Sequence, residues 1–237
     1  MTGSKFKDAL EGLGGAAFIA IHLLLNPILR RWRDRWGATE AEVNRPLPGD
    51  ELVHHPKWRY THAVTIHAPA EKVWPWLGQI GQGRGGLYSY EWLENLAGCD
   101  MHNADRIVPE HQLKVGDGVR LGPKGYPLYK VAAIESYRAL VLVGADPKTE
   151  EVTRVTDPMP TTYTNGNWVF VLKPIDDHTT RLLVRGLLDY APDNFANTLI
   201  WRVMTEPIGF VMERKMLLGI KQRAEAATAR HAEAVPA

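Results

Sequence analysis

The chain has 237 residues, and its 45% hydrophobic content is enough for one large domain with a real core. Twenty-eight basic residues nearly balance 27 acidic ones, and a net charge of +1 without a long basic block argues against nucleic acid as a partner. Cys99 is the only cysteine, which excludes an intramolecular disulfide. The eight Trp and eight Tyr side chains suit ligand cavities and membrane interfaces, because each ring pairs an apolar body with a polar tip.

Residues 12–29, GLGGAAFIAIHLLLNPIL, predict a helix that is apolar around its whole circumference. The run is short for crossing a bilayer, and His22, Asn26 and Pro27 weaken that interpretation further. Arginines interleaved with Trp32 and Trp36 follow this run, as in the flank of a segment at a membrane interface. Because positively charged flanks stay on the cytoplasmic side of a membrane, the downstream domain would be cytoplasmic. Residues 12–36 are therefore predicted either to associate with a membrane, lying on the bilayer or passing through it, or to pack on the protein's own domain or a partner.

A polar, proline-bearing linker is expected over residues 37–57, lying on the surface of a main domain that covers residues 58–228. Alternation of apolar residues predicts a first strand over residues 60–66, and helical spacing predicts a helix from residue 68 that Pro75 kinks. A second short helix should follow and end at Gly98. The last nine residues, 229–237, are expected to form a frayed tail.

From residue 115 to residue 190 the pattern becomes a series of β-favouring runs separated by Gly, Pro or Asp. Most of the intervals are too short for crossover helices, which predicts a meandering antiparallel sheet. Residues 145–166 are expected to be mostly loop, with one edge strand around residues 152–155. A long helix should follow over residues 195–229, interrupted at Pro207. Its expected buried face consists of Phe195, Leu199, Val203, Ile208, Val211, Met212, Leu217 and Ile220.

The segment HAVTIHAPAEKVWPWLGQIG, residues 62–81, resembles the opening of the SRPBCC superfamily, which includes START-like and polyketide cyclase/dehydrase-like proteins. The similarity is most specific over residues 68–76 and extends loosely over residues 58–227. It implies an α+β helix-grip fold, in which a curved antiparallel sheet wraps around the long C-terminal helix and encloses an apolar cavity; the N-terminal hydrophobic helix is an addition. The superfamily has no single activity, so function must be argued from the site.

The stretch GCDMHNADRIVPE, residues 98–110, holds the candidate catalytic residues His102, Asp105 and Arg106. If Asp105 oriented the His102 imidazole, the histidine could act as a general base. The alternative is a capped turn in which Asp and Asn side chains bond nearby amides.

No metal or cofactor is expected. Cys99 has no CxxC partner, and HExxH does not occur in the chain. The Gly81-x-Gly83-x-x-Gly86 motif follows a predicted helix, whereas a dinucleotide fingerprint needs a strand before it. We therefore expect a turn with positive φ angles there.

Two further polar positions have alternative interpretations. Arg185 alternates with apolar residues in a predicted strand, which favours the outer, solvated face over a position inside the cavity, where a ligand anion could pair it. Glu206 and Glu213 lie seven residues apart on one face of the long helix. An exposed helix surface is favoured for both over a pair that performs acid–base chemistry.

The predicted function is binding, and perhaps transfer, of a hydrophobic or amphipathic small molecule such as a lipid or a polyketide-like compound. A cyclase/dehydrase-like enzyme and a membrane-associated interaction module are the alternatives. Candidate ligand-binding residues are Tyr88, Tyr90, Trp92, Asn103, Trp168, Arg185, Trp201 and Glu206.

Overall fold

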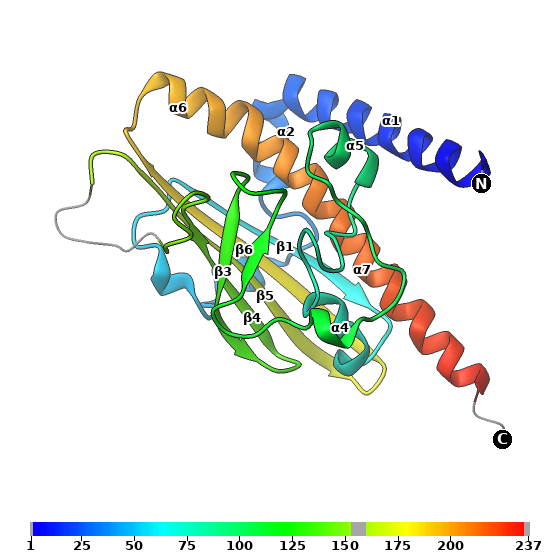
Figure 1. Ribbon diagram of the computed structural model, residues 1–237. Coiled ribbons are helices and arrows are strands. Elements are labelled where there is room, and N and C mark those ends of the chain that lie inside the picture. Colours follow the sequence, from blue (N-terminus) through cyan, green and yellow to red (C-terminus); the bar gives the residue numbers. More distant parts are fainter. Residues whose placement is uncertain (1, 153–159, 235–237) are drawn as a thin grey trace.

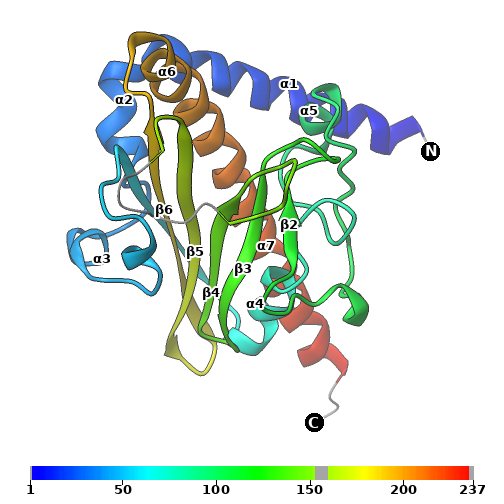
Figure 2. The ribbon, with the colours of Figure 1, turned by 60° about the vertical axis from the view of Figure 1, so that its left-hand side comes forward.

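A computed structural model describes the backbone of residues 2–152 and 160–234 and the side chains of residues 9–152 and 160–230. Six antiparallel strands form one sheet in the order β1-β6-β5-β4-β3-β2. Its strands are β1 (Trp58–Ile66), β2 (Gly118–Arg120), β3 (Leu128–Glu135), β4 (Ala139–Ala145), β5 (Tyr163–Asp176) and β6 (Thr179–Ala191). The long helix α7 (Glu206–Ala234) crosses one face of the curved sheet, as Figures 1 and 2 show. This is the predicted α+β helix-grip arrangement with an additional N-terminal helix.

The remaining helices lie around this grip. They are α1 (Thr2–Leu24), α2 (Asn26–Arg33), α3 (Glu40–Asn44), α4 (Ala70–Leu77), α5 (Glu91–Leu96) and α6 (Phe195–Leu199), with short turns η1 (Asp50–Leu52), η2 (Pro109–His111) and the π-helical η3 (Ile200–Thr205). The predicted domain boundaries at residues 36, 57 and 228 stay predictions. Helix α7 continues to Ala234, and the last three residues of the predicted tail lie outside the described residues, as do residues 153–155 of the predicted edge strand.

The core lies between the sheet and α7, because the strands turn every second side chain toward that helix. The predicted face of the long helix is buried at Val211, Leu217 and Ile220. Toward the N-terminus of the same helical run the prediction is wrong, since Phe195 is 82% exposed and Leu199 is 45% exposed. The reason is geometric: α6 lies beyond the end of the sheet (Figure 1), whereas Trp201 in the following η3 stacks on Tyr190 of β6.

The linker packs over the outer face of the sheet. For this reason Arg185 has the predicted outer-face position but is not solvated there. This arginine lies on the outer face but is fully buried, because the linker packs over it. Its guanidinium donates to Asp50 Oδ2 at 2.6 Å and to the backbone carbonyls of Glu42, Val43 and Arg45. Arg185 is therefore neither solvated nor a ligand-binding residue of the interior; it attaches the linker to the sheet.

The N-terminal helices pack on the protein's own domain. Helix α1 contacts α5 and α7, and the chain then bends by 108° into α2. After α2 the chain runs along the edge strand β1, where Thr61 donates its amide to the Asp34 carbonyl and Ala63 donates to Trp36. Within the described residues, no one helix has the length and apolar character to cross a membrane; the bent pair Ala9–Leu24 and Asn26–Arg33 meets the criterion jointly, by length and composition alone.

The glycine motif between α4 and α5 forms the predicted turn. Gly81, Gly83 and Gly86 have φ angles of 120°, 74° and 75°, values that side chains with a Cβ disfavour. Arg84 is anchored within this turn by the Asp117 carboxylate at 3.1 Å.

Candidate functional site

A pocket of about 200 Å³ lies between the inner face of the sheet and the first turns of α7; we call it the inner pocket. Apolar and aromatic side chains form most of its wall, and a few polar groups reach into it. Its lining residues are Trp58, Tyr60, His62, Leu87, Ser89, Glu94, Leu121, Tyr129, Trp168, Thr205, Gly209, Phe210, Met212, Glu213 and Met216. An apolar chamber with few polar groups is the usual composition of a small-molecule site.

Glu213 is the centre of the polar cluster in this wall. It lies on α7 and is 7% exposed, which corrects the sequence-based preference for a solvated position. Its Oε2 accepts hydrogen bonds from the Tyr60 hydroxyl at 2.8 Å and from Trp168 Nε1 at 2.7 Å. Its Oε1 lies 2.5 Å from Nδ1 of His62, a residue that is 1% exposed. The buried carboxylate is therefore satisfied by three polar partners from β1 and β5, as a buried charge requires.

The protonation of His62 follows from its two partners. Nε2 lies 2.9 Å from the Arg33 carbonyl oxygen, which can only accept, so Nε2 carries a hydrogen. Nδ1 faces the carboxyl of Glu213, and a contact of 2.5 Å between these two groups needs one proton between them. The pair is either imidazolium with carboxylate or imidazole with carboxylic acid. In both forms a hydrogen bond joins Nδ1 of His62 to Oε1 of Glu213 in the wall of the inner pocket.

Two tyrosines of the wall are held in their protonated form. Desolvation, followed by the nearby Glu213 carboxylate, raises the pKa of Tyr60 well above its usual value. The same two causes raise the pKa of Tyr129 to about 12. Both hydroxyls are hydrogen-bond donors at physiological pH.

Glu94 is the second carboxyl group of the inner pocket. It lies on α5, is 5% exposed, and its Oε2 has no hydrogen-bond partner among the described residues. Burial, with a smaller effect from the Glu91 carboxylate, raises the pKa of Glu94 to about 7. A large part of the molecules therefore carry Glu94 as a neutral carboxylic acid near neutral pH, with an O–H group available to a ligand.

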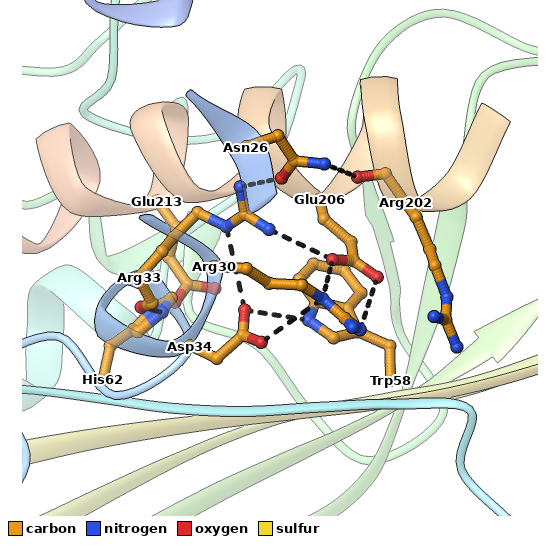
Figure 3. Close-up of polar contacts among 9 residues, drawn as sticks. All are labelled: Asn26, Arg30, Arg33, Asp34, Trp58, His62, Arg202, Glu206 and Glu213. Carbon is orange, nitrogen blue, oxygen red and sulfur yellow. Dashed lines mark hydrogen bonds and ion pairs between the residues drawn. The ribbon is translucent and has the colours of Figure 1, made fainter. Parts of the chain in front are cut away.

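Residues of helix α2 and of the turn after it lie next to His62, Glu206 and Glu213 and fix their positions (Figure 3). Arg33 is fully buried; its carbonyl holds His62, and its guanidinium donates to Glu206 Oε2 at 3.1 Å. Arg30 donates to the same carboxylate at 2.9 Å, and Trp58 donates to Asp34 Oδ1 at 3.2 Å. Two arginines and two carboxylates balance in charge, which is the condition for burying such a cluster. Residues 30–34 thus connect the N-terminal helices to β1 and to the start of α7.

Of the eight predicted ligand-binding residues, only Trp168 lines the inner pocket. Glu206 is buried in the cluster with the two arginines, contrary to the solvated position favoured from sequence. Trp201 stacks on Tyr190 at 5.5 Å. Arg185 lies beneath the linker, as described above.

The other four candidates lie around an outer groove between α1, α5 and α7. Tyr88 is buried and donates its hydroxyl to the Trp76 carbonyl, and burial raises its pKa to about 12. Asn103 accepts from the Tyr88 amide at 2.5 Å. The candidates that line this groove are Tyr88, Tyr90, Trp92 and Asn103.

The catalytic candidates of the 98–110 stretch do not line the inner pocket. The His102 side chain is 77% exposed and lies near Glu91 and Asp100, at 3.6 and 3.5 Å, so the structure does not pair it with Asp105. Asp105 and Arg106 are exposed. The stretch forms the alternative, a turn held by side-chain bonds to its backbone, as when the Met101 amide donates to Asn95. No three His, Cys, Asp or Glu side chains gather to hold a metal ion in the part of the chain that the structure describes.

The residues that build the site were present in the sequence pattern but were not recognised as a site. Tyr60 and His62 alternate in the predicted first strand, so their common face was visible. The sequence favours a solvated helix surface for Glu213. Glu94 lies in a helix of mixed polarity, EWLENL, and no local pattern distinguishes a buried glutamate from an exposed one there.

Comparison with known proteins leaves the family open. No protein-family model and no curated protein matches the chain. Similar solved structures include a hypothetical protein from Helicobacter pylori, with 12% identity over 76% of this chain and 95% of that chain and a TM-score of 0.44. A conserved protein from Geobacillus kaustophilus has 12% identity over 72% and 97% of the two chains, with a TM-score of 0.40. Truncated norcoclaurine synthase from Thalictrum flavum has 13% identity over 70% and 91%, with a TM-score of 0.40. Similarities this low carry no argument about function, and membership in the SRPBCC superfamily stays a prediction.

Proposed function

We propose that the protein binds a compact small molecule with an apolar body and a hydrogen-bond acceptor in the inner pocket. The observation that carries the proposal is the Glu94 carboxyl, which belongs to a residue that lines this apolar chamber and whose buried Oε2 has no hydrogen-bond partner among the described residues. Leaving such a group unsatisfied costs about 1–3 kcal/mol, and a ligand carbonyl or hydroxyl oxygen would remove that cost. The resemblance to the SRPBCC superfamily supports the same kind of function.

The size of the inner pocket narrows the ligand class. Its volume is about 200 Å³, whereas ligand pockets commonly enclose roughly 300–1,000 Å³. A cavity of about 150 Å³ accommodates benzene. We therefore propose a ligand of about one or two rings rather than a complete lipid or a multi-ring polyketide.

Binding can be tested with 4′-fluoroacetophenone, a one-ring ketone observed by fluorine NMR. The wild-type protein should bind the ketone more tightly than 1-ethyl-4-fluorobenzene, which lacks the carbonyl acceptor. Gly209→Leu should abolish binding, because the position lines the inner pocket and the atom nearest to an added Cβ is 4.0 Å away, so the side chain fills the space without a clash.

Gly14→Leu is the matched control, since nothing lies within 4 Å of its added Cβ and it lies on α1. Equal affinity of the wild-type protein and Gly209→Leu for the ketone would contradict the proposal, as would equal affinity for ketone and hydrocarbon.

Acid–base catalysis is a second candidate function, favoured by the proton shared between His62 and Glu213 in the pocket that also holds Glu94. In an enolisation, the His62–Glu213 pair accepts a proton from the carbon next to a carbonyl while Glu94 donates its proton to the carbonyl oxygen. The C–H bond breaks, an O–H bond forms, and the reverse transfers restore the ketone. A donor and an acceptor with separate environments are the general arrangement for such chemistry.

Acetophenone in D₂O tests this candidate, because enolisation replaces its methyl protons with deuterium and the methyl signal in proton NMR declines. Glu94→Gln and Glu213→Gln should each slow the exchange by at least about 100-fold, the usual contribution of one proton-transfer group. Exchange at the rate of the buffer alone, with the ketone bound, would leave the protein as a binding protein without this activity.

A further inference from the structure

An exposed apolar surface covers the end of the molecule where α1, α2, α6 and η3 meet; we call it the apolar shoulder. Leu24 is 81% exposed, Ile28 is 77% exposed and Phe195 is 82% exposed. Exposed apolar side chains gathered on neighbouring elements can mark an interaction site. Its residues are Ile21, Leu24, Leu25, Ile28, Trp32, Phe195, Leu199, Ile200, Val203 and Met204. We propose that the apolar shoulder docks on the surface of an anionic lipid bilayer.

Two segments that are far apart in the sequence form this surface together. Figures 1 and 2 show α6 beside the corner between α1 and α2 at one end of the molecule. Asn26 Nδ2 donates to the Arg202 carbonyl at 2.9 Å, and Arg30 and Arg33 bind Glu206 at the following turn. These buried contacts hold α2 against η3, so the apolar side chains are presented outward on a fixed support.

The charges around the apolar shoulder favour an anionic bilayer over another occupant. Residues 12–33 and 195–205 contain four arginines, of which Arg30 and Arg33 pair with Glu206. Arg31 and Arg202 are exposed, and Trp32 is 50% exposed, so cations and an amphipathic ring accompany the apolar side chains. Anionic lipid attracts such cations. In a two-fold dimer the same patch meets itself, which would bring like charges together.

The apolar shoulder also borders the inner pocket. η3 ends at Thr205, which lines the pocket, and the Thr205 hydroxyl donates to the Ile200 carbonyl at 3.1 Å within the π-helical turn. Single π-helical turns inside long helices are often found at functional sites. A bilayer in contact with η3 would therefore lie next to one wall of the chamber. The docking proposal itself does not depend on ligand binding.

Co-sedimentation with large unilamellar vesicles tests the proposal. The full-length protein should bind vesicles of phosphatidylcholine with 30% phosphatidylglycerol more tightly than vesicles of phosphatidylcholine alone. The double variant Leu24→Gln/Ile28→Gln should reduce partitioning by about tenfold for each side chain, because each loses an apolar contact with the bilayer. Arg31→Gln/Arg202→Gln should reduce binding to the anionic vesicles by about fivefold for each charge, and added salt should have the same direction of effect.

Leu96→Gln/Ile175→Gln is the matched control, since these side chains are 72% and 58% exposed and lie outside the apolar shoulder. Unchanged vesicle binding of the Leu24/Ile28 variant, or no binding by the wild-type protein, would overturn the proposal. Sedimentation velocity without vesicles tests for a dimer. A dimer that dissociates when Leu24 and Ile28 are replaced would also overturn the proposal. The result for the ketone in the inner pocket is independent of all three outcomes.

Discussion

The unpartnered carboxyl of Glu94 should make the stability of the protein depend on pH. Burial raises its pKa from the ordinary 4.5 to about 7. The folded protein therefore binds more protons than the unfolded chain between these two values. The contribution of Glu94 is fully present below the unfolded pKa and is lost as the pH rises through the folded pKa. At about 1.4 kcal/mol for each pKa unit, the loss amounts to about 3 kcal/mol.

Glu94→Gln removes this dependence, because the amide has nearly the same shape and cannot ionise. In chemical denaturation at pH 4 the free energies of unfolding of wild-type protein and variant should coincide. At pH 8 the variant should be more stable by about 3 kcal/mol, which corresponds to a melting temperature about 6–12 °C higher for a chain of this size. A buried group that lowers stability at physiological pH is expected where function requires it.

Glu71→Gln serves as the control, since Glu71 is an exposed glutamate on α4, and this variant should retain the pH dependence of the wild-type protein. A Glu94→Gln protein whose stability changes with pH as the wild type does would refute the reasoning. It would mean that Glu94 is ionised in the folded protein, and the ligand class proposed for the inner pocket would then lose its basis.

Three further substitutions test the supports of the site by chemical denaturation. Glu206→Ala leaves the buried Arg33 without its closest carboxylate, with Asp34 remaining at 3.7 Å, and should lower the free energy of unfolding by about 3–5 kcal/mol; a loss near zero would show that water reaches the arginine. Trp168→Phe removes a donor to Glu213 and should cost about 1.5–3 kcal/mol, whereas an unchanged stability would mean that the bond is not made in solution. Gly37→Ala should cost more than about 1 kcal/mol, because φ is +71° and the added Cβ would lie 2.1 Å from a carbonyl oxygen of β1; a neutral effect would contradict the pairing of residues 34–36 with that strand.

Local periodicity was sufficient for the order of the main strands and helices, and the resemblance to a known superfamily implied the fold class. Tyr60, His62, Val64 and Ile66 share one face of β1 because strand side chains alternate, and the antiparallel order followed from short intervals between strands. The positive φ angles of the 81–86 turn followed from its glycines. Each of these features depends only on residues close together in the chain.

The inner pocket could not be predicted from local periodicity, because its polar cluster joins residues that lie far apart in the sequence. His62 meets Glu213 at a sequence separation of 151, and Arg33 meets Glu206 at 173. Periodicity indicates which side chains share a face, but it does not indicate what covers that face. The same reason explains why the outer-face position of Arg185 was predicted but its burial was not, since only the folded linker buries it.

By itself, then, the sequence determined the secondary-structure pattern and the apolar character of residues 12–29, and its resemblance to a known superfamily implied the helix-grip arrangement. The tertiary structure alone decided that two glutamates of the long helix are buried, that Glu94 lines an apolar chamber, and that the start of the long helical run lies exposed beside α2. Burial and pairing depend on which helices and strands pack together. That packing is determined by the free energy of the whole fold rather than by the residues of any one segment.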